Sequence, residues 1–180
     1  MIRRLVQISG IVLTAVLLFA GTGSAQTFDV SGGYAWLHED ELTVPNGWYG
    51  AAGFNLNDSF GIFGQLSQHK KTIISVGVDV DTKLTIFGAG PRISGNQRAG
   101  VTYFAQVLLG GAKSEASAKN LSSATFKDTN FALQPAAGVD VKAGGTVGVR
   151  LQGGLTLIKS ASNDWEKEWV FMVGIVFRGG

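Results

Sequence analysis

The sequence predicts an all-β protein: an eight-stranded antiparallel up-and-down transmembrane β-barrel, preceded by a cleavable signal peptide. Two observations support this fold class. Apolar and polar residues alternate with a period of two through most of the chain, which is the period of a β-strand. The links between these segments are alternately long and short, as in an up-and-down barrel whose two ends face different compartments.

The first 25 residues have the features of a secretory signal peptide. Arg3 and Arg4 supply a basic start, residues 11–20 form an apolar run, and small residues lead to Ala25 at the expected cleavage site. The apolar run is shorter than the roughly 20 residues that a membrane-spanning helix needs. We therefore expect residues 1–25 to be removed and residues 26–180 to form one β-barrel domain.

The composition excludes several classes of function. Removing Arg3 and Arg4 lowers the 15 Lys+Arg residues to 13, which balances the 13 Asp+Glu residues, so the mature chain has no net charge to attract nucleic acid. The chain has no cysteine, which excludes disulfides, thiolate metal sites and a lipoprotein anchor. We expect no metal and no cofactor.

Eight candidate strands follow the signal peptide in order. They span 27–37, 47–56, 59–68, 78–92, 99–111, 130–141, 146–158 and 167–178. The short links at 57–58 and 144–145 are Asn-Asp and Gly-Gly pairs, which favour tight turns. The long links are 38–46, 69–77, 112–129 and 159–166. We expect the long links at the extracellular end and both termini at the periplasmic end.

Each strand has one face of apolar and small residues. A charge on a lipid-facing wall costs about 2–4 kcal/mol at the bilayer midplane, so this exclusion of charge predicts a wall in contact with lipid. A soluble secreted barrel with an apolar cavity is the alternative. In chain order the expected lipid-facing residues are Phe28, Val30, Gly32, Tyr34 and Trp36; Trp48, Gly50, Ala52, Phe54 and Leu56; Phe60, Ile62, Gly64 and Leu66; Val78, Val80, Leu84, Ile86 and Gly88; Val101, Tyr103, Ala105, Val107 and Leu109; Phe131, Leu133, Pro135, Ala137 and Val139; Val147, Val149, Leu151, Gly153, Leu155 and Leu157; and Trp169, Phe171, Val173, Ile175 and Phe177.

The opposite faces supply a polar lumen. An eight-stranded barrel has an interior that side chains just fill, so we expect no open pore. Asp140 and Arg150 lie on neighbouring strands and should pair, because a buried charge persists only with a partner. The predicted lumen network comprises Asn55, Gln65, Gln106, Gln134, Asp140, Arg150 and Gln152.

The register of the fourth strand is open at this stage. Continuing its alternation from Ile86 places Arg92 on the lipid-facing wall near the periplasmic rim. A β-bulge at Gly88 or Gly90 would turn Arg92 into the lumen instead.

Trp36, Trp48 and Trp169 lie near the outer ends of the first, second and eighth strands, which are neighbours once the barrel closes. They predict a one-sided aromatic girdle at the membrane interface. A patch for a protein partner is the alternative reading.

Three segments resemble the small eight-stranded outer-membrane β-barrel family of the OmpA/OmpX type. They are residues 30–34 (VSGGY), 87–92 (FGAGPR) and 171–178 (FMVGIVFR), and the resemblance covers residues 26–180. It implies an outer-membrane location among outer-membrane lipids and lipopolysaccharide, and recognition of the closing strand by the barrel assembly machinery. The family favours a terminal aromatic residue there, whereas this chain continues to Gly180.

Two groups of residues raise the question of chemistry. Ser67 and His69 share one face of the third strand, and barrels that modify lipid A use Ser and His near the outer rim; without an evident acidic partner, we expect no catalytic residues. Acidic residues 39–41 and basic residues 69–71 lie in the first two long links. Solvated loop charge is the simplest reading of these clusters, and a site for a cation or a phosphate is the alternative.

The function that the sequence favours is that of a non-enzymatic outer-membrane barrel with a filled lumen. It would serve envelope integrity or surface interaction through its long extracellular loops. The alternatives are a lipid A-modifying enzyme that uses Ser67 and His69, and a soluble ligand-binding barrel.

Overall fold

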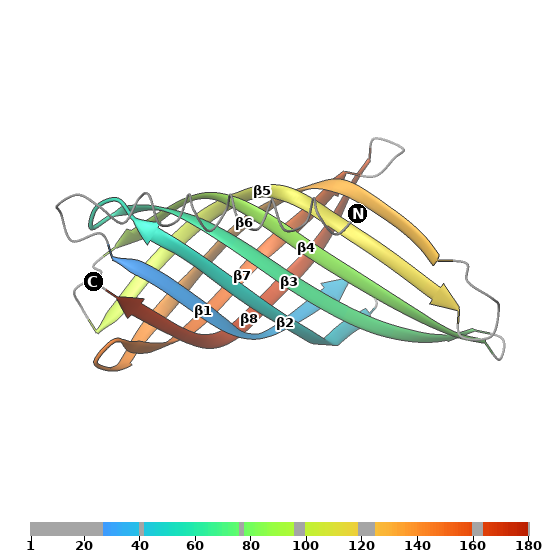
Figure 1. The fold of residues 1–180 in the computed structure, drawn as a ribbon, viewed down its shortest axis with the longest axis horizontal. Coiled ribbons are helices and arrows are strands. Elements are labelled where there is room, and N and C mark those ends of the chain that lie inside the picture. Colours follow the sequence, from blue (N-terminus) through green and yellow to red (C-terminus); the bar gives the residue numbers. More distant parts are fainter. Residues whose placement is uncertain are drawn as a thin grey trace, which may run out of the picture.

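The computed structural model is a closed barrel of eight strands, each antiparallel to the next (Figure 1). It describes residues 27–39, 42–75, 78–95, 100–118, 125–159 and 164–179, so the predicted signal peptide lies outside the described residues. The strands are β1 (Phe28–Glu39), β2 (Leu42–Asn55), β3 (Phe60–Ser75), β4 (Val78–Gly95), β5 (Val101–Ala118), β6 (Thr125–Gly144), β7 (Val147–Lys159) and β8 (Trp165–Gly179). The predicted fold class, strand number and strand order are confirmed.

The barrel closes where β8 pairs with β1. This ladder runs without interruption from Phe28 opposite Gly179 to His38 opposite Trp169. Closure removes the unpaired sheet edges that would otherwise promote aggregation. Within the described residues, no helix has the length and apolar character needed to cross a membrane.

Two short connections are built from turn-forming residues. The side chain of Asn57 accepts hydrogen bonds from the backbone N–H groups of Ser59 at 2.9 Å and Phe60 at 2.8 Å, which fixes the β2–β3 turn. Gly145 adopts a φ of 51° in the β6–β7 turn, a conformation that strongly favours glycine. Both turns lie at the barrel end where β1 begins and β8 ends, called the terminal end below.

The opposite end, called the hairpin end, carries the β1–β2, β3–β4, β5–β6 and β7–β8 connections. Here the structure differs from the predicted strand ends, because β3 continues to Ser75, β5 to Ala118, and β6 begins at Thr125. Most of the predicted links 69–77 and 112–129 is therefore paired strand, and Figure 1 shows the β3–β4 and β5–β6 hairpins extending from the barrel. Large apolar residues do not alternate with polar ones in these segments, so the sequence pattern did not mark them as strands.

Apolar side chains on the outer wall match the predicted lipid-facing set on seven strands. In β7, for example, Val149 and Leu151 are exposed while Arg150 and Gln152 are buried in the lumen. The fourth strand was predicted with the wrong phase. Ile86 is buried inside the barrel, and its neighbour Phe87 faces outward.

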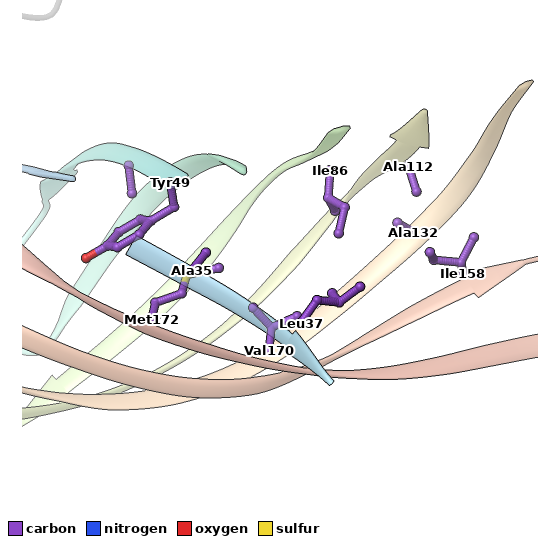
Figure 2. Packing of buried hydrophobic residues seen from close by; sticks show 10 residues of the cluster. Ala35, Leu37, Tyr49, Ile86, Ala112, Ala132, Ile158, Val170 and Met172 are labelled. Carbon is purple, nitrogen blue, oxygen red and sulfur yellow. The ribbon is translucent and has the colours of Figure 1, made fainter. Parts of the chain in front are cut away.

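The lumen also contains an apolar cluster, which the sequence did not predict (Figure 2). It lies toward the hairpin end, where Leu37 pairs across strands with Val170 and Ala132 with Ile158. Its buried members are Ala35, Leu37, Tyr49, Ala51, Ile86, Ala112, Ala132, Ile158, Val170 and Met172. The lumen is thus divided between this cluster and a polar network nearer the terminal end.

Candidate functional site

The centre of the polar network is Arg150 of β7. Its Nε and Nη2 atoms donate hydrogen bonds to the two carboxylate oxygens of Asp140, each at 2.7 Å, and its Nη1 donates to the Ser31 hydroxyl at 2.9 Å. Asp140 faces Arg150 directly across the β6–β7 ladder. This two-point contact is the strongest geometry available to an arginine and a carboxylate.

Arg178 of β8 joins the same network from the terminal end. Its Nη2 donates to Asp140 at 2.6 Å and its Nη1 donates to the Thr102 hydroxyl at 3.0 Å. Its Nε lies 3.5 Å from a carboxylate oxygen of Asp29, and Nη2 of Arg150 lies 3.7 Å from the other. The carboxylates of Asp29 and Asp140 therefore both contact the guanidinium groups of Arg150 and Arg178. Together these residues connect β1, β6, β7 and β8.

Arg92 of β4 is held differently, although only 1 % of it is exposed. Its Nε and Nη2 donate to the side-chain oxygen of Gln106 at 2.9 and 2.6 Å. Its guanidinium carbon lies 3.5 Å from the centre of the Phe63 ring and 4.3 Å from that of Phe104. Cation–π contact with two rings stabilises the desolvated charge.

The inward direction of Arg92 needs no bulge. The β3–β4 and β4–β5 ladders continue on both sides of Gly88 and Gly90 without a register shift. Even-numbered residues of this part of β4 therefore point inward, including Ile86 and Arg92. The predicted lipid-facing position of Ile86 is wrong. The alternative, in which Arg92 points into the lumen, has the correct direction for Arg92 but not the bulge that it invoked.

Glycines make room for the two phenylalanine rings around Arg92. A Cβ added to Gly53 or Gly61 would meet the Phe63 ring, and one added to Gly138 would meet the Phe104 ring. These inward-facing glycines let large rings lie across the narrow barrel, in keeping with the small interior of eight strands.

Glutamines extend the network toward the apolar cluster. The amide of Gln106 donates to Gln65 at 3.3 Å, and that of Gln152 donates to the same Gln65 oxygen at 3.0 Å. Gln134 is buried beside them, and together with Gln65 and Gln152 it lines a cavity of about 10 Å³. A volume of this size accommodates about one water molecule.

Six of the seven predicted lumen residues thus lie in one buried region, and Asn55 lies apart from them. The Asn55 amide donates to Thr27 at the terminal end. The seven-residue prediction of the lumen network did not include Asp29, Arg92 and Arg178. Alternation had placed Asp29 and Arg178 on the polar face, whereas the side of Arg92 was left open because the phase of its strand was wrong.

The tryptophans predicted as a girdle lie on the outer wall of β1, β2 and β8. Trp48 and Trp169 are about half exposed, Trp48 is paired with Tyr34, and Trp36 is paired with Phe171. The rings of Tyr34 and Trp36 lie with their centres 6.5 Å apart. The three tryptophans therefore occupy one side of the barrel toward the hairpin end.

Ser67 and His69 both point into the lumen, where each is 2 % exposed. Neither ring nitrogen of His69 has a hydrogen-bond partner, so the serine hydroxyl is not bonded to a histidine base as nucleophilic catalysis requires. His69 lies within β3 and not in the loop where the basic cluster was predicted. Asp40 and Glu41 of the acidic cluster lie outside the described residues.

No group of three or more metal-ligating side chains occurs among the residues that the structure describes. The arrangement is that of a packed interior held by charge-assisted hydrogen bonds.

Comparison with known proteins identifies the fold. No protein-family model and no curated protein matches the sequence. Among solved structures, the chain is similar to Ail, the attachment invasion locus protein of Yersinia pestis, in a complex with the heparin analogue sucrose octasulfate. The two share 20% sequence identity with a TM-score of 0.62, over 87% of this chain and 100% of Ail.

Two further solved structures are similar to this chain. Neisserial surface protein A is 15% identical with a TM-score of 0.61, over 87% of this chain and 99% of that one. The N-terminal β-barrel domain of Pseudomonas aeruginosa OprF is 10% identical with a TM-score of 0.58, over 85% and 97%. The chain therefore has the fold of the small eight-stranded outer-membrane barrels.

Proposed function

We propose that this protein is a non-enzymatic, integral outer-membrane barrel that supports envelope integrity or surface interaction through its hairpin end. The observation that carries the proposal is the separation of the two faces of its wall. Lumen charges such as Arg150 and Asp140 are buried and paired. The described outward-facing side chains between the two ends of the barrel are uncharged, and many are large and apolar.

This separation is the reverse of a soluble barrel, which places its apolar residues inside and its charges in water. A charge on the outer wall would cost about 2–4 kcal/mol at the bilayer midplane, so its absence there fits a surrounding of acyl chains. The fold shared with outer-membrane barrels supports the same location. In this orientation the termini lie in the periplasm and the hairpin end faces outward, with β8 recognised by the barrel assembly machinery.

The aromatic residues fit this proposal. Trp36, Trp48 and Trp169 would anchor one side of the barrel at the outer membrane–water interface, where tryptophan is favoured. Ser67 and His69 are buried in the lumen, whereas a lipid substrate would approach from the outer wall. Their position therefore argues against a lipid-modifying role. The similar Ail barrel was found with sucrose octasulfate, which shows that a barrel of this fold can bind a polyanion.

Fractionation and spin labelling test the proposal. The protein should stay in outer membranes washed with urea and should change its gel mobility on heating. Labels at Val149 and Leu151 should contact hydrocarbon, and a label at Gln152 should be shielded from it. Water contact at Val149 and Leu151 together with release by urea would favour the soluble barrel. Lipid A of unchanged mass in a deletion strain is the expected result for a non-enzyme.

A further inference from the structure

Lysines gather on the outer wall at the hairpin end of β3, β4 and β5. Lys70 is paired with Lys83 across β3 and β4, and Lys83 is paired with Glu115 across β4 and β5. Lys113 lies two residues before Glu115 and so shares its face. All four point outward, because the intervening residues of these strands, such as His69 and Ala112, are buried in the barrel.

The cluster carries an excess of positive charge. Nζ of Lys113 lies 2.7 Å from one oxygen of Glu115, and Nζ of Lys83 lies 3.8 Å from the other. Lys70 is exposed beside them. Three lysines against one glutamate give a net charge of +2 on adjacent strands. This charge matches the phosphate group of an anionic ligand.

A shallow groove of about 760 Å³ lies on the outer wall below the lysines. Its outward-facing sides are the mostly apolar residues Val30, Ala52, Leu66, Phe87, Ala89 and Leu109. Gly50 and Gly64 form part of its floor. A Cβ on Gly50 would meet no atom within 4 Å, and one on Gly64 would meet only two carbonyl oxygens at 3.8 and 3.9 Å. Barrel packing therefore does not require these two glycines, and their effect is to hollow the wall.

The groove and the lysines are on the same strands and within reach of one lipid molecule. Lys70 lies six positions after Gly64, which is roughly 20 Å along a strand. With the usual tilt of about 35–45°, this corresponds to a depth of roughly 15 Å, or half of the roughly 30 Å hydrocarbon core. An acyl chain of the outer leaflet spans this depth when its headgroup lies at the lysines.

We propose that the outer wall of β2 to β5 binds one phosphorylated, acylated lipid of the outer leaflet, of the lipid A type. Lys70, Lys83 and Lys113 hold its phosphate, and one acyl chain lies in the groove over Gly50 and Gly64. This proposal rests on the proposed outer-membrane function, which turns the hairpin end toward that leaflet. A soluble polyanion would use the lysines without the groove, so the two cases can be distinguished.

Native mass spectrometry of the full-length mature protein, purified in detergent, tests the site with three probes. The probes are bisphosphorylated lipid A, dephosphorylated lipid A and the deacylated bisphosphorylated disaccharide. The wild-type protein should bind the first probe at least about tenfold more tightly than either of the others. Equal affinity for the dephosphorylated or the deacylated probe would overturn the proposal.

Variants separate the two halves of the site. The double variant Lys70→Gln/Lys83→Gln should weaken lipid A binding by about tenfold or more, since each basic residue near a membrane surface contributes roughly fivefold to lipid binding. Gly64→Leu, or Gly50→Leu, should weaken it by filling the groove. Lys142→Gln and Gly95→Leu at the terminal end are the matched controls, because Lys142 is exposed and a Cβ on Gly95 has open space.

Two outcomes with these variants would contradict the proposal. A loss of binding in the lysine variant with no loss in Gly64→Leu and Gly50→Leu would indicate a headgroup-only anion site. An equal loss in Lys142→Gln would indicate nonspecific charge attraction. Heat-modifiable gel mobility confirms that each variant folds.

Failure of the proposed function and failure of the lipid site give different results. If the proposed function were wrong, urea would release the wild-type protein from membranes. If only the lipid site were wrong, the protein would stay in the membrane, and its variants would bind lipid A as tightly as the wild type.

Discussion

At the scale of single residues, the lumen shows how an eight-stranded barrel can contain buried charge. Asp140 accepts hydrogen bonds from both Arg150 and Arg178, and no other described carboxylate in the lumen contacts both guanidinium groups as closely. Arg92 instead relies on Gln106 and two aromatic rings. Each arginine therefore has a compensating contact, and the two that share Asp140 depend on one carboxylate.

Replacing Asp140 with Asn should therefore destabilise the barrel strongly. Removing one partner of a buried ion pair costs about 3–5 kcal/mol, because the other charge remains in a low-dielectric site. Urea unfolding of the protein in lipid vesicles, followed by tryptophan fluorescence, measures this free energy. Glu166→Gln, at an exposed position near the hairpin end of β8, should change it by less than about 0.5 kcal/mol. Equal unfolding free energies for both variants would show that the network does not stabilise the fold.

The residue contacts differ in how far the sequence could predict them. The pairing of Asp140 with Arg150 was predictable, because the short Gly144-Gly145 link sets the register of their hairpin. The contacts of Arg92 with Phe63 and Phe104 were not, because they cross the barrel between strands that are far apart in the sequence. Alternation predicts whether a residue faces the lumen, but it does not predict which side chain from the other side of the barrel contacts it.

At the scale of strands, the number and order of elements followed from alternation and turn chemistry, whereas the strand ends did not. β3 continues seven residues past the predicted end at residue 68, with Lys70 paired to Lys83 and Ile73 to Val80. Where a strand extends beyond the lipid-facing band of the barrel, its outer face no longer needs to be apolar. The backbone hydrogen bonds to the next strand continue there, but the alternation of apolar and polar residues that identifies a strand in the sequence is lost.

The β6–β7 turn offers a test at this scale. Gly145→Val should lower the unfolding free energy by about 1–2 kcal/mol, because a β-branched L-residue is strained at its φ of 51°. Gly95→Val is the control, since Gly95 lies at the same end of the barrel in open space. The same vesicle unfolding experiment compares the two variants. A loss for Gly95→Val as large as that for Gly145→Val would contradict the assignment of strain to the turn.

At the scale of the whole molecule, the lumen is blocked by two layers of different chemistry. The arginine–aspartate–glutamine network fills the terminal end, and the apolar cluster around Leu37, Ile158 and Met172 fills the hairpin end. Alternation places Val170 and Met172 on the inner face, but it does not show that apolar residues from different strands pack into one layer, and it placed Ile86 on the wrong face. A filled interior leaves the outer wall and the hairpin end as the surfaces available for interaction, which agrees with the proposed function.

A barrel with two blocking layers should conduct no ions, even when one layer is thinned. We expect the purified protein in planar lipid bilayers to give no stepwise conductance, and Ile158→Ala to give none either, because the polar network remains in place. A porin with a water-filled lumen, recorded under the same conditions, confirms that insertion would be detected. Conductance steps of the wild-type protein that grow in proportion to salt concentration would mean that a continuous aqueous path exists. That result would replace the filled-lumen proposal with a channel. Conductance steps in Ile158→Ala but not in the wild-type protein would show that the apolar layer is the principal barrier to ions.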